Sequence, residues 1–469
     1  MRKILFVLCF GSLCATTSAQ QNQQKIDSVV ALVKKYFNAQ DADKLYELTG
    51  DKFRQQLSKE QFATIGTNNL FPLGEMKDVV LEQNKNGLAT YKASFTAMDL
   101  LLILSLDAKD QLEAFLFKPY KTLEKKTTST PSDNKLATAI DKSVDSAMQA
   151  YLSAKPTVGA SVGILKDGKM YLYNYGEAVK GSNQLPGTHT LYEIGSITKT
   201  FTSLLLADAV ERKKIKLDDP VNKYLPSTIP SLQLDGVPVT IKTLANHTSG
   251  LPRMPDNFSD STKEGDPYVD YTKENMFDFL KTVKLGAKPG TRYDYSNLGA
   301  ALLGVILEKI NGKSFEAMVK EKITTPLGMN ETKQTLLQGD LPRFAKGYDE
   351  KGAETSHWNF KAFAPAGALR STSSDMLKYA QAQINAPKSL KNAIELTHTV
   401  TFDNKMKLGL AWHYIKPGKD EVLFHNGGTG GFRSYLAVDE KRKLAVVVLS
   451  NSALDVDESG NSIMRSLQR

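Results

Sequence analysis

Residues 191–210 read LYEIGSITKTFTSLLLADAV, an apolar stretch that turns at Gly195 and then continues with apolar residues at helical spacing. The pattern predicts a largely buried helix with Ser196 in its first turn. Lys199 follows three residues later, so it lies on the same face as Ser196 and within reach of its hydroxyl. The free N–H groups at the start of such a helix would stabilise an oxyanion formed there.

This Ser-x-x-Lys spacing is typical of a nucleophile with its base. Burial disfavours the charged form of a lysine, so Lys199 in apolar surroundings could accept a proton. The structural alternative is that Ser196 caps the helix and Lys199 extends its ammonium group to solvent. The tetrapeptide alone does not decide, because Ser132-Asp-Asn-Lys135 has the same spacing in a polar stretch.

A second polar cluster lies in residues 289–299, PGTRYDYSNLG, just before an apolar stretch that predicts a helix over 300–310. A tyrosine beside a lysine is stabilised as the phenolate, so Tyr295 could move protons between Ser196 and a leaving group. Asn297 is both a donor and an acceptor, which suits orienting Lys199 and binding a substrate amide. The alternative for Tyr295 is a half-buried aromatic with a packing role.

A third cluster, HNGGTGGF, occupies residues 425–432 after a predicted strand. Four glycines in five residues allow a backbone to approach a ligand closely and to turn an N–H toward it. We expect the N–H groups of Ser196 and Gly428 to form an oxyanion hole. His425, Asn426 and Gly427 are the predicted substrate-binding residues, and the alternative is an ordinary glycine-rich turn.

The N-terminus predicts a secretory signal peptide over residues 1–19, with Arg2 and Lys3 before an apolar run and cleavage after Ala19. Cys9 and Cys14, the two cysteines of the chain, both lie in this segment. The mature chain would therefore have no disulfide, no thiol catalysis and no thiolate metal site. We expect a periplasmic or secreted protein.

Charge and spacing exclude several classes of partner. The formal net charge of +9 falls to +7 when residues 1–19, with two basic and no acidic residues, are removed, and no long Lys/Arg run concentrates it. Nucleic-acid binding is therefore disfavoured. No later stretch reaches the roughly 18 apolar residues of a membrane span. The histidines lack zinc-motif spacing and Gly-x-Ser-x-Gly is absent, so we expect no metal, no cofactor and no α/β-hydrolase.

The order of predicted elements indicates two domains. Residues 20–120 show helical spacing and then four strands, which favours a small α+β domain, and the polar residues 121–135 are expected to be a linker. Residues 136–469 begin with a helix and a hairpin, continue with helices, and end with strands and a short helix. We expect both ends to share one antiparallel sheet packed by the first and last helices.

Taken together, the three clusters resemble the serine β-lactamase and penicillin-binding-protein-like family, on its class C side. Further stretches that resemble this family are LANHTSGL at 244–251, PLGM at 326–329 and PAGALRSTSSD at 365–375. The resemblance implies an α+β β-lactamase/transpeptidase-like domain, an antiparallel sheet flanked by helices plus an all-helical region. The segment before it is similar to NTF2-like domains, which implies an α+β fold whose concave sheet can bind a ligand or a second copy. A spacer or dimerisation module is the favoured role, so a homodimer could form through this domain.

The family resemblance also implies roles. Ser196 would be the acylated nucleophile, Lys199 its base, Tyr295 the proton relay, and Asn297 a partner of substrate and lysine. His425 stands where the family has the lysine of Lys-Thr-Gly, and His-x-Gly is similar to the carboxypeptidase and D-aminopeptidase branch.

The resulting expectation is an exported serine hydrolase that forms an acyl-enzyme on an amide or ester, in a small molecule or, above all, a D-amino-acid peptide. A carboxylesterase or a β-lactamase is the enzymatic alternative, and a penicillin-binding sensor or an inactive scaffold is the non-enzymatic one.

Overall fold

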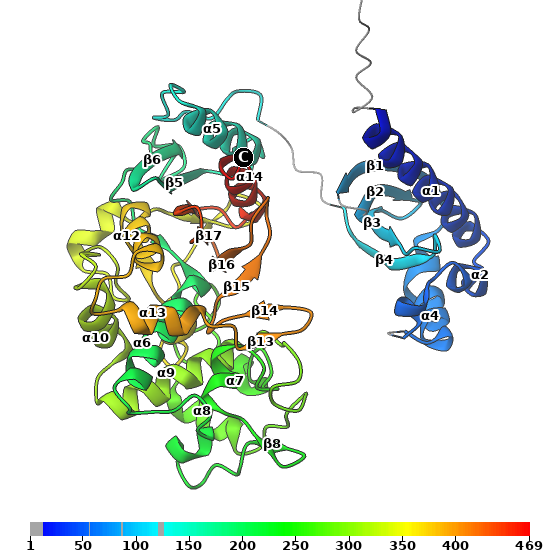
Figure 1. The fold of residues 1–469 in the computed structure, drawn as a ribbon. Helices are drawn as coiled ribbons and strands as arrows, with labels where there is room; N and C mark the ends of the chain where they lie inside the picture. The colour runs from blue at the N-terminus through cyan, green and yellow to red at the C-terminus, as the bar shows by residue number, and fades with distance from the viewer. Residues whose placement is uncertain (1–12, 56, 86–87, 121–125) are drawn as a thin grey trace, which may run out of the picture. The chain divides into compact units, whose positions relative to one another are not determined.

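The computed structural model describes residues 13–55, 57–85, 88–120 and 126–469 (Figure 1). The chain divides into two compact units, with the division between Thr122 and Leu123. Residues 1–12 of the predicted signal peptide lie outside the described residues. Within the described ranges, no helix has both the length and the apolar character needed to span a bilayer.

The first unit is an antiparallel sheet of four strands in sequential order, with the long helix α1 packed on it (Figure 1). Its helices are α1 (Leu13–Asn38), α2 (Ala42–Glu47), α3 (Asp51–Arg54) and α4 (Lys59–Ile65), and its strands are β1 (Met76–Lys85), β2 (Leu88–Phe95), β3 (Asp99–Leu106) and β4 (Leu112–Pro119). Alternate side chains of β2 and β3 are buried and face the apolar side of α1, including Val33 and Phe37. The predicted helices and meander are present, and the likeness to NTF2-like domains stays a prediction.

The second unit is built on an eight-stranded antiparallel sheet with the order β13-β14-β15-β16-β17-β18-β5-β6. These strands are β13 (Phe402–Asp403), β14 (Lys407–Leu408), β15 (His413–Ile415), β16 (Val422–Gly428), β17 (Arg433–Asp439), β18 (Leu444–Ser450), β5 (Gly159–Lys166) and β6 (Lys169–Gly176). Strand β18 pairs with β5, with Val448 opposite Val162. The expectation that the two ends of this domain share one sheet is therefore confirmed.

Helices cover both faces of this sheet (Figure 1). The helices of the unit are α5 (Ala139–Leu152), α6 (Thr198–Glu211), α7 (Ile241–Ala245), α8 (Lys273–Leu280), α9 (Asn297–Asn311), α10 (Phe315–Val319), α11 (Ala364–Gly367), α12 (Ser373–Ile384), α13 (Lys391–His398) and α14 (Asp457–Leu467). The first and last, α5 and α14, pack on one face, as predicted, and enclose a smaller core. Helix α12 packs on the other face, where a larger core extends into the helical region around α6 and α9.

Three short strand pairs complete the unit: β7 (Tyr192–Glu193) with β12 (Arg370–Ser371), β8 (Gln233–Leu234) with β9 (Val237–Pro238), and β10 (Gly347–Tyr348) with β11 (Glu354–Thr355). The pair β7–β12 matters for the site, because β7 leads directly into residues 195–197.

Of the expected linker 121–135, residues 121–125 lie outside the described residues, and the rest makes contacts with the second unit. Gly176 N donates to Pro131 O at 2.8 Å, and the Asp133 carboxylate accepts hydrogen bonds from both amides of Asn174 at 2.8 and 2.7 Å. Strand β6 ends the sheet and has unpaired backbone groups, so polar side chains in this segment satisfy an open edge rather than remaining solvated.

Candidate active site

Ser196 lies in a 3₁₀ turn, Gly195–Ile197, between β7 and helix α6. The turn needs glycine before the serine, because Gly195 has φ +48° and a Cβ atom there would lie 2.7 Å from Gly428 N. A backbone hydrogen bond from Ile194 N to Leu369 O at 3.0 Å ties the turn to the residue just before β12. The serine is thus presented by a tightly fixed backbone at the start of a buried helix.

Lys199 is on the first turn of α6 and is 1% exposed. Its Nζ donates to Ser196 Oγ at 3.0 Å and to Ala366 O at 2.6 Å. Burial lowers the pKa of Lys199 well below its usual value, and the nearby positive charge of Arg253 lowers it further. The structure thus brings the two residues together, and the lysine is disposed to accept the proton of the hydroxyl.

Tyr295 lies beside both of these residues. Its ring centroid is 4.9 Å from Lys199 Nζ and 5.0 Å from Arg253 Cζ. Burial raises the pKa of Tyr295, and its hydrogen bond with Ser196 offsets only part of this. The expected phenolate is therefore wrong: Lys199 is itself desolvated and inclined to be neutral, so it supplies little positive charge. Tyr295 is a phenol that can give a proton.

Asn297 does not contact Lys199 as expected. Helix α9 begins at Asn297 rather than at 300, with Ser296 as its N-cap, whose Oγ accepts from Gly299 N at 2.9 Å. This cap directs the Asn297 amide toward Met254, where Nδ2 lies 3.6 Å from Sδ. The two acceptors of Lys199 are Ser196 Oγ and Ala366 O instead.

The glycines of the third cluster continue strand β16 as far as Gly428, and the turn comes only at residues 429–432. The strand runs against the nucleophile turn. A Cβ atom at Gly427 would lie 2.1 Å from Ile194 O and 2.9 Å from Ser196 N. The backbone of Gly428 in turn approaches Gly195. Ser196 and Gly428 therefore lie close together, as the predicted oxyanion hole requires.

His425 and Asn426 point in different directions from β16. His425 is buried, and its Nδ1 donates to Asn426 O at 2.7 Å, so the neutral ring carries its proton on Nδ1. Burial and the neighbouring His413 lower the pKa of His425 well below its usual value. The exposed Asn426 donates from Nδ2 to Asp457 Oδ2 at 2.6 Å. His425, at the position where the family resemblance implies a lysine, is thus a buried neutral group.

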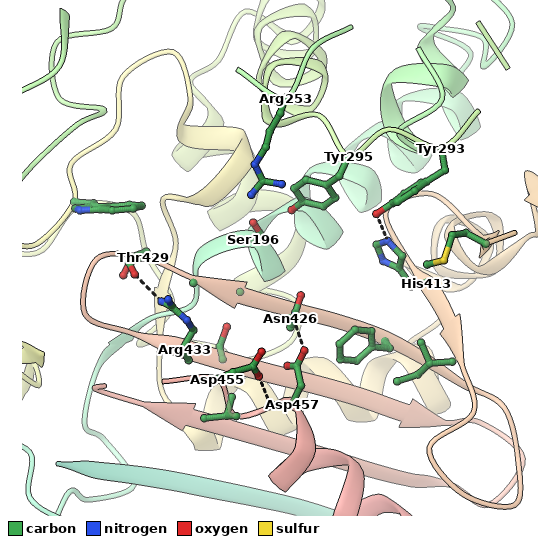
Figure 2. A pocket seen from close by; sticks show the side chains of 18 residues that line it. Ser196, Arg253, Tyr293, Tyr295, His413, Asn426, Thr429, Arg433, Asp455 and Asp457 are labelled. Carbon is green, nitrogen blue, oxygen red and sulfur yellow. Dashed lines mark hydrogen bonds between the residues drawn. The ribbon is translucent and has the colours of Figure 1, made fainter. Parts of the chain in front are cut away.

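A cavity of about 630 Å³ opens over Ser196 (Figure 2). Tyr295 and residues 426–428 line it, as predicted. Sequence reasoning missed other lining residues, which are Arg253, Tyr293, Trp358, His413, Arg433, Asp455 and Asp457. Arg253 stands two residues after the recognised stretch 244–251, and Arg433 directly follows the glycine cluster, so both could have been found by proximity. Asp455 and Asp457 carry no such signal.

Two histidines support the tyrosines of this cavity. The Nδ1 atom of His247 accepts from Ser296 N at 3.2 Å, and its ring centroid is 4.4 Å from that of Tyr295. His413 is in the cavity wall, with Nε2 2.9 Å from the Tyr293 hydroxyl. Burial lowers the pKa of His413 to about 4. Among the described residues, no three His, Cys, Asp or Glu side chains are grouped to hold a metal ion.

Comparison with known proteins gives a family match. A family model described as beta-lactamase matches residues 144–467. The D-alanyl-D-alanine-carboxypeptidase/endopeptidase AmpH of Escherichia coli strain K12 is 31% identical over 310 residues, which cover 62% of this chain and 79% of that protein. A beta-lactamase of Pseudomonas fluorescens is 29% identical over 352 residues, covering 67% and 94%.

Solved structures agree with this match. A class C beta-lactamase superposes with a TM-score of 0.62 at 28% identity, covering 70% of this chain and 96% of its own. The beta-lactamase/D-alanine carboxypeptidase of Yersinia pestis, solved with citrate, superposes with a TM-score of 0.60 at 27% identity, covering 67% and 94%.

Proposed function

The chain belongs to the beta-lactamase family and is a serine hydrolase, and from this premise we propose that it is exported and cleaves amide bonds in D-amino-acid peptides through an acyl-enzyme. One observation carries the mechanism: the hydrogen bond of 3.0 Å from Nζ of the buried Lys199 to Ser196 Oγ. The peptide substrate is supported by the names of relatives that are carboxypeptidases.

In the acylation step, neutral Lys199 takes the proton of the Ser196 hydroxyl while Oγ attacks the substrate carbonyl carbon. The N–H groups of Ser196 and Gly428 donate to the oxyanion of the tetrahedral intermediate. Tyr295 then protonates the leaving nitrogen as its bond to carbon breaks, and Lys199 returns a proton to Tyr295. The serine remains as an ester with the acyl part of the substrate.

Deacylation follows the same path in reverse. Water attacks the ester carbonyl and gives its proton to the Tyr295–Lys199 pair, and the tetrahedral intermediate is again held by the two N–H donors. Collapse of this intermediate releases the acid, and Ser196 Oγ recovers a proton from Lys199. No cofactor enters the balance of atoms and charges.

The glycine strand favours peptides over β-lactams as substrates. In a β-lactamase with the Lys-Thr-Gly motif, a lysine and a hydroxyl would stand where this chain has His425 and Asn426. His425 has a low pKa and supplies less positive potential, and the Asn426 amide is bound by Asp457. β-Lactam hydrolysis is the second candidate, supported by the class C beta-lactamase likeness.

A panel assay tests the proposal. The wild-type chain, Ser196→Ala and Ser132→Ala are compared on a D-Ala-D-Ala peptide, a chromogenic cephalosporin and a short-chain ester, with mass spectrometry after exposure to a penicillin. Ser132→Ala is the matched control, because Ser132 and Lys135 repeat the same spacing outside the cavity.

We expect peptide cleavage and a penicillin adduct on Ser196, both lost only in Ser196→Ala. Hydrolysis retained by Ser196→Ala would reject the mechanism. Cephalosporin turnover without peptide cleavage would show that the substrate is a β-lactam and not a peptide. Export is tested separately, since a secreted chain should begin at Gln20 in N-terminal mass analysis.

A further inference from the structure

Arg253 brings a positive charge to the catalytic cavity that the proposed mechanism does not use. Figure 2 shows its side chain entering the cavity toward Ser196 and Tyr295. Its backbone is anchored, because Arg253 O accepts from the N–H groups of Asn297 and Leu298 at 3.0 and 3.2 Å, at the start of α9. The loop after α7 that carries Arg253 is therefore tied to the segment that carries Tyr295, and the exposed guanidinium lies against the Tyr295 ring.

Within the described part of the chain, the guanidinium of Arg253 has no ion-pair partner. Among the residues that the structure describes, no carboxylate lies within 4.0 Å of it and none of its N–H groups has an acceptor, so its contact is with the ring of Tyr295. The other arginine of the cavity differs: Arg433 donates from Nη1 to Thr429 O at 2.7 Å and to Phe432 O at 2.9 Å. Arg253 alone presents its whole fork of donors to the cavity.

Charges of both signs line the cavity. Figure 2 shows Arg253 on one side of Ser196 and Asp455, Asp457 and Arg433 on the other. His425, at the position where the family resemblance implies a lysine, is neutral. An anionic group of a substrate would meet mixed charges on that second side, would gain little from His425, and would find two parallel N–H donors at Arg253.

We propose that Arg253 is the specificity-determining residue that binds a carboxylate of the substrate beside the scissile bond. The proposal rests on the proposed function, because it names the chemistry of the substrate that Ser196 attacks. Positive charge for substrate recognition is thus supplied by the loop after α7 and not by strand β16. Arg253 also lies close enough to lower the pKa of Lys199, so its removal should affect proton transfer as well.

The test uses three nitrophenyl esters of similar size. One carries a carboxylate on the acyl part (4-nitrophenyl hemiglutarate), one carries it on the leaving part (3-carboxy-4-nitrophenyl butyrate), and one is neutral (4-nitrophenyl methyl glutarate). The wild type is compared with Arg253→Gln, Arg253→Lys and Lys169→Gln. The last removes one positive charge from the exposed end of the β5–β6 hairpin, away from the cavity.

We expect the wild type to prefer one anionic ester, and Arg253→Gln to reduce that preference about tenfold or more, mainly through KM, since a charged bidentate contact is lost. Arg253→Lys should recover part of it, and Lys169→Gln should match the wild type. On the neutral ester, the acidic limb of the pH profile should move to higher pH in Arg253→Gln, because Lys199 loses a neighbouring cation.

The proposal would be overturned if the ratio of kcat/KM on the anionic ester to kcat/KM on the neutral ester were the same in the wild type and in Arg253→Gln. A binding measurement keeps it testable without turnover: calorimetry of glutarate with Ser196→Ala should give a Kd about tenfold lower than with Ser196→Ala/Arg253→Gln, and equal values would also overturn it. Hydrolysis by Ser196→Ala, in contrast, would reject the proposed function. The glutarate measurement would then decide alone whether Arg253 binds a carboxylate.

Discussion

The backbones of Gly427 and Ser196 are in direct contact: a Cβ atom on residue 427 would come within 2.9 Å of Ser196 N. Strand β16 is therefore locked against the nucleophile turn without side chains between them. The two N–H donors of the proposed oxyanion hole belong to Ser196 and to Gly428, the residue after Gly427, so their separation depends on a glycine that itself donates nothing.

Gly427→Ala should consequently lower the rate of acylation strongly. The added methyl group also meets Ile194 O at 2.1 Å, so the strand must shift, and loss of one oxyanion donor costs about 100-fold or more in rate. The acylation rate with a penicillin measures this. Gly339→Ala is the control, because a Cβ atom there meets nothing within 4 Å. A Gly427→Ala protein that acylates at the wild-type rate would show that the contact does not set the donor geometry.

The pH profile should reflect the two pKa shifts of the site. The pKa of Lys199 is lowered by burial, so the neutral base is present well below pH 10.5 and kcat/KM should fall only as the pH drops through the lowered value. The pKa of Tyr295 is raised, so loss of its proton should not reduce activity below pH 10.

Lys199→Arg should lower the activity about 10²- to 10⁴-fold, since arginine stays protonated and cannot act as the base. For the same reason the acidic limb of its pH profile should be absent. Stopped-flow or steady-state rates from pH 5 to 10 provide the measurement. A wild-type rate that still climbs steadily at pH 10 would mean that Lys199 keeps its ordinary pKa.

The sequence predicted those parts of the site that depend on local spacing. Ser196 and Lys199 are three residues apart on one helix, so their contact follows from helical geometry alone. The expected Asn297–Lys199 contact failed because it depends on how the start of α9 is capped, and the capping serine turns the amide to Met254.

Contacts between distant segments had no local signal. Asp457 becomes part of the cavity because the first residue of α14 lies against Asn426 of β16, and the charge of Arg253 matters because its guanidinium lies beside Tyr295. The phenolate prediction failed for a related reason: it assumed a charged lysine, whereas burial acts on both groups at once.

Asp457 should make stability depend on pH. Burial and the neighbouring Asp455 raise the pKa of Asp457 to about 7, whereas an unfolded aspartate titrates near 4. Between these values the unfolded chain gains charge and the folded chain does not, so stability from this group is present at low pH and is lost as the pH rises to about 7.

Asp457→Asn should therefore be more stable than the wild type at pH 8, by about 1–4 kcal/mol, and the difference should shrink at pH 4 to 5. Denaturant unfolding at both pH values measures this. Asp403→Asn, at an exposed strand end, is the control for the loss of one negative charge. A constant difference between pH 4 and 8 would contradict the shifted titration.

The ion pair behind the nucleophile turn should dominate local stability. Glu193 and Arg370 face each other across β7 and β12, with Oε1 and Nη2 3.4 Å apart and side chains 3% and 4% exposed. Burial raises the pKa of Glu193, and the charge of Arg370 counteracts this. Both side chains also bind the backbone of Trp358, at 2.9 Å to N and 2.7 Å to O, so the pair holds the segment that borders the cavity.

Arg370→Met should destabilise the fold by about 3–5 kcal/mol, because it leaves a buried carboxylate without its partner. The loss of stability should be smaller at low pH, because the mutation raises the pKa of Glu193 further and the carboxyl group then takes up a proton. It should be smaller again in Glu193→Gln/Arg370→Met, where no charge is buried. Unfolding free energies of the two single variants and the double variant at pH 5 and 8 measure the coupling. If the double variant loses as much as the sum of the two single variants, then the pair acts through packing, and the charge on Glu193 does not determine how firmly the turn of Ser196 is held.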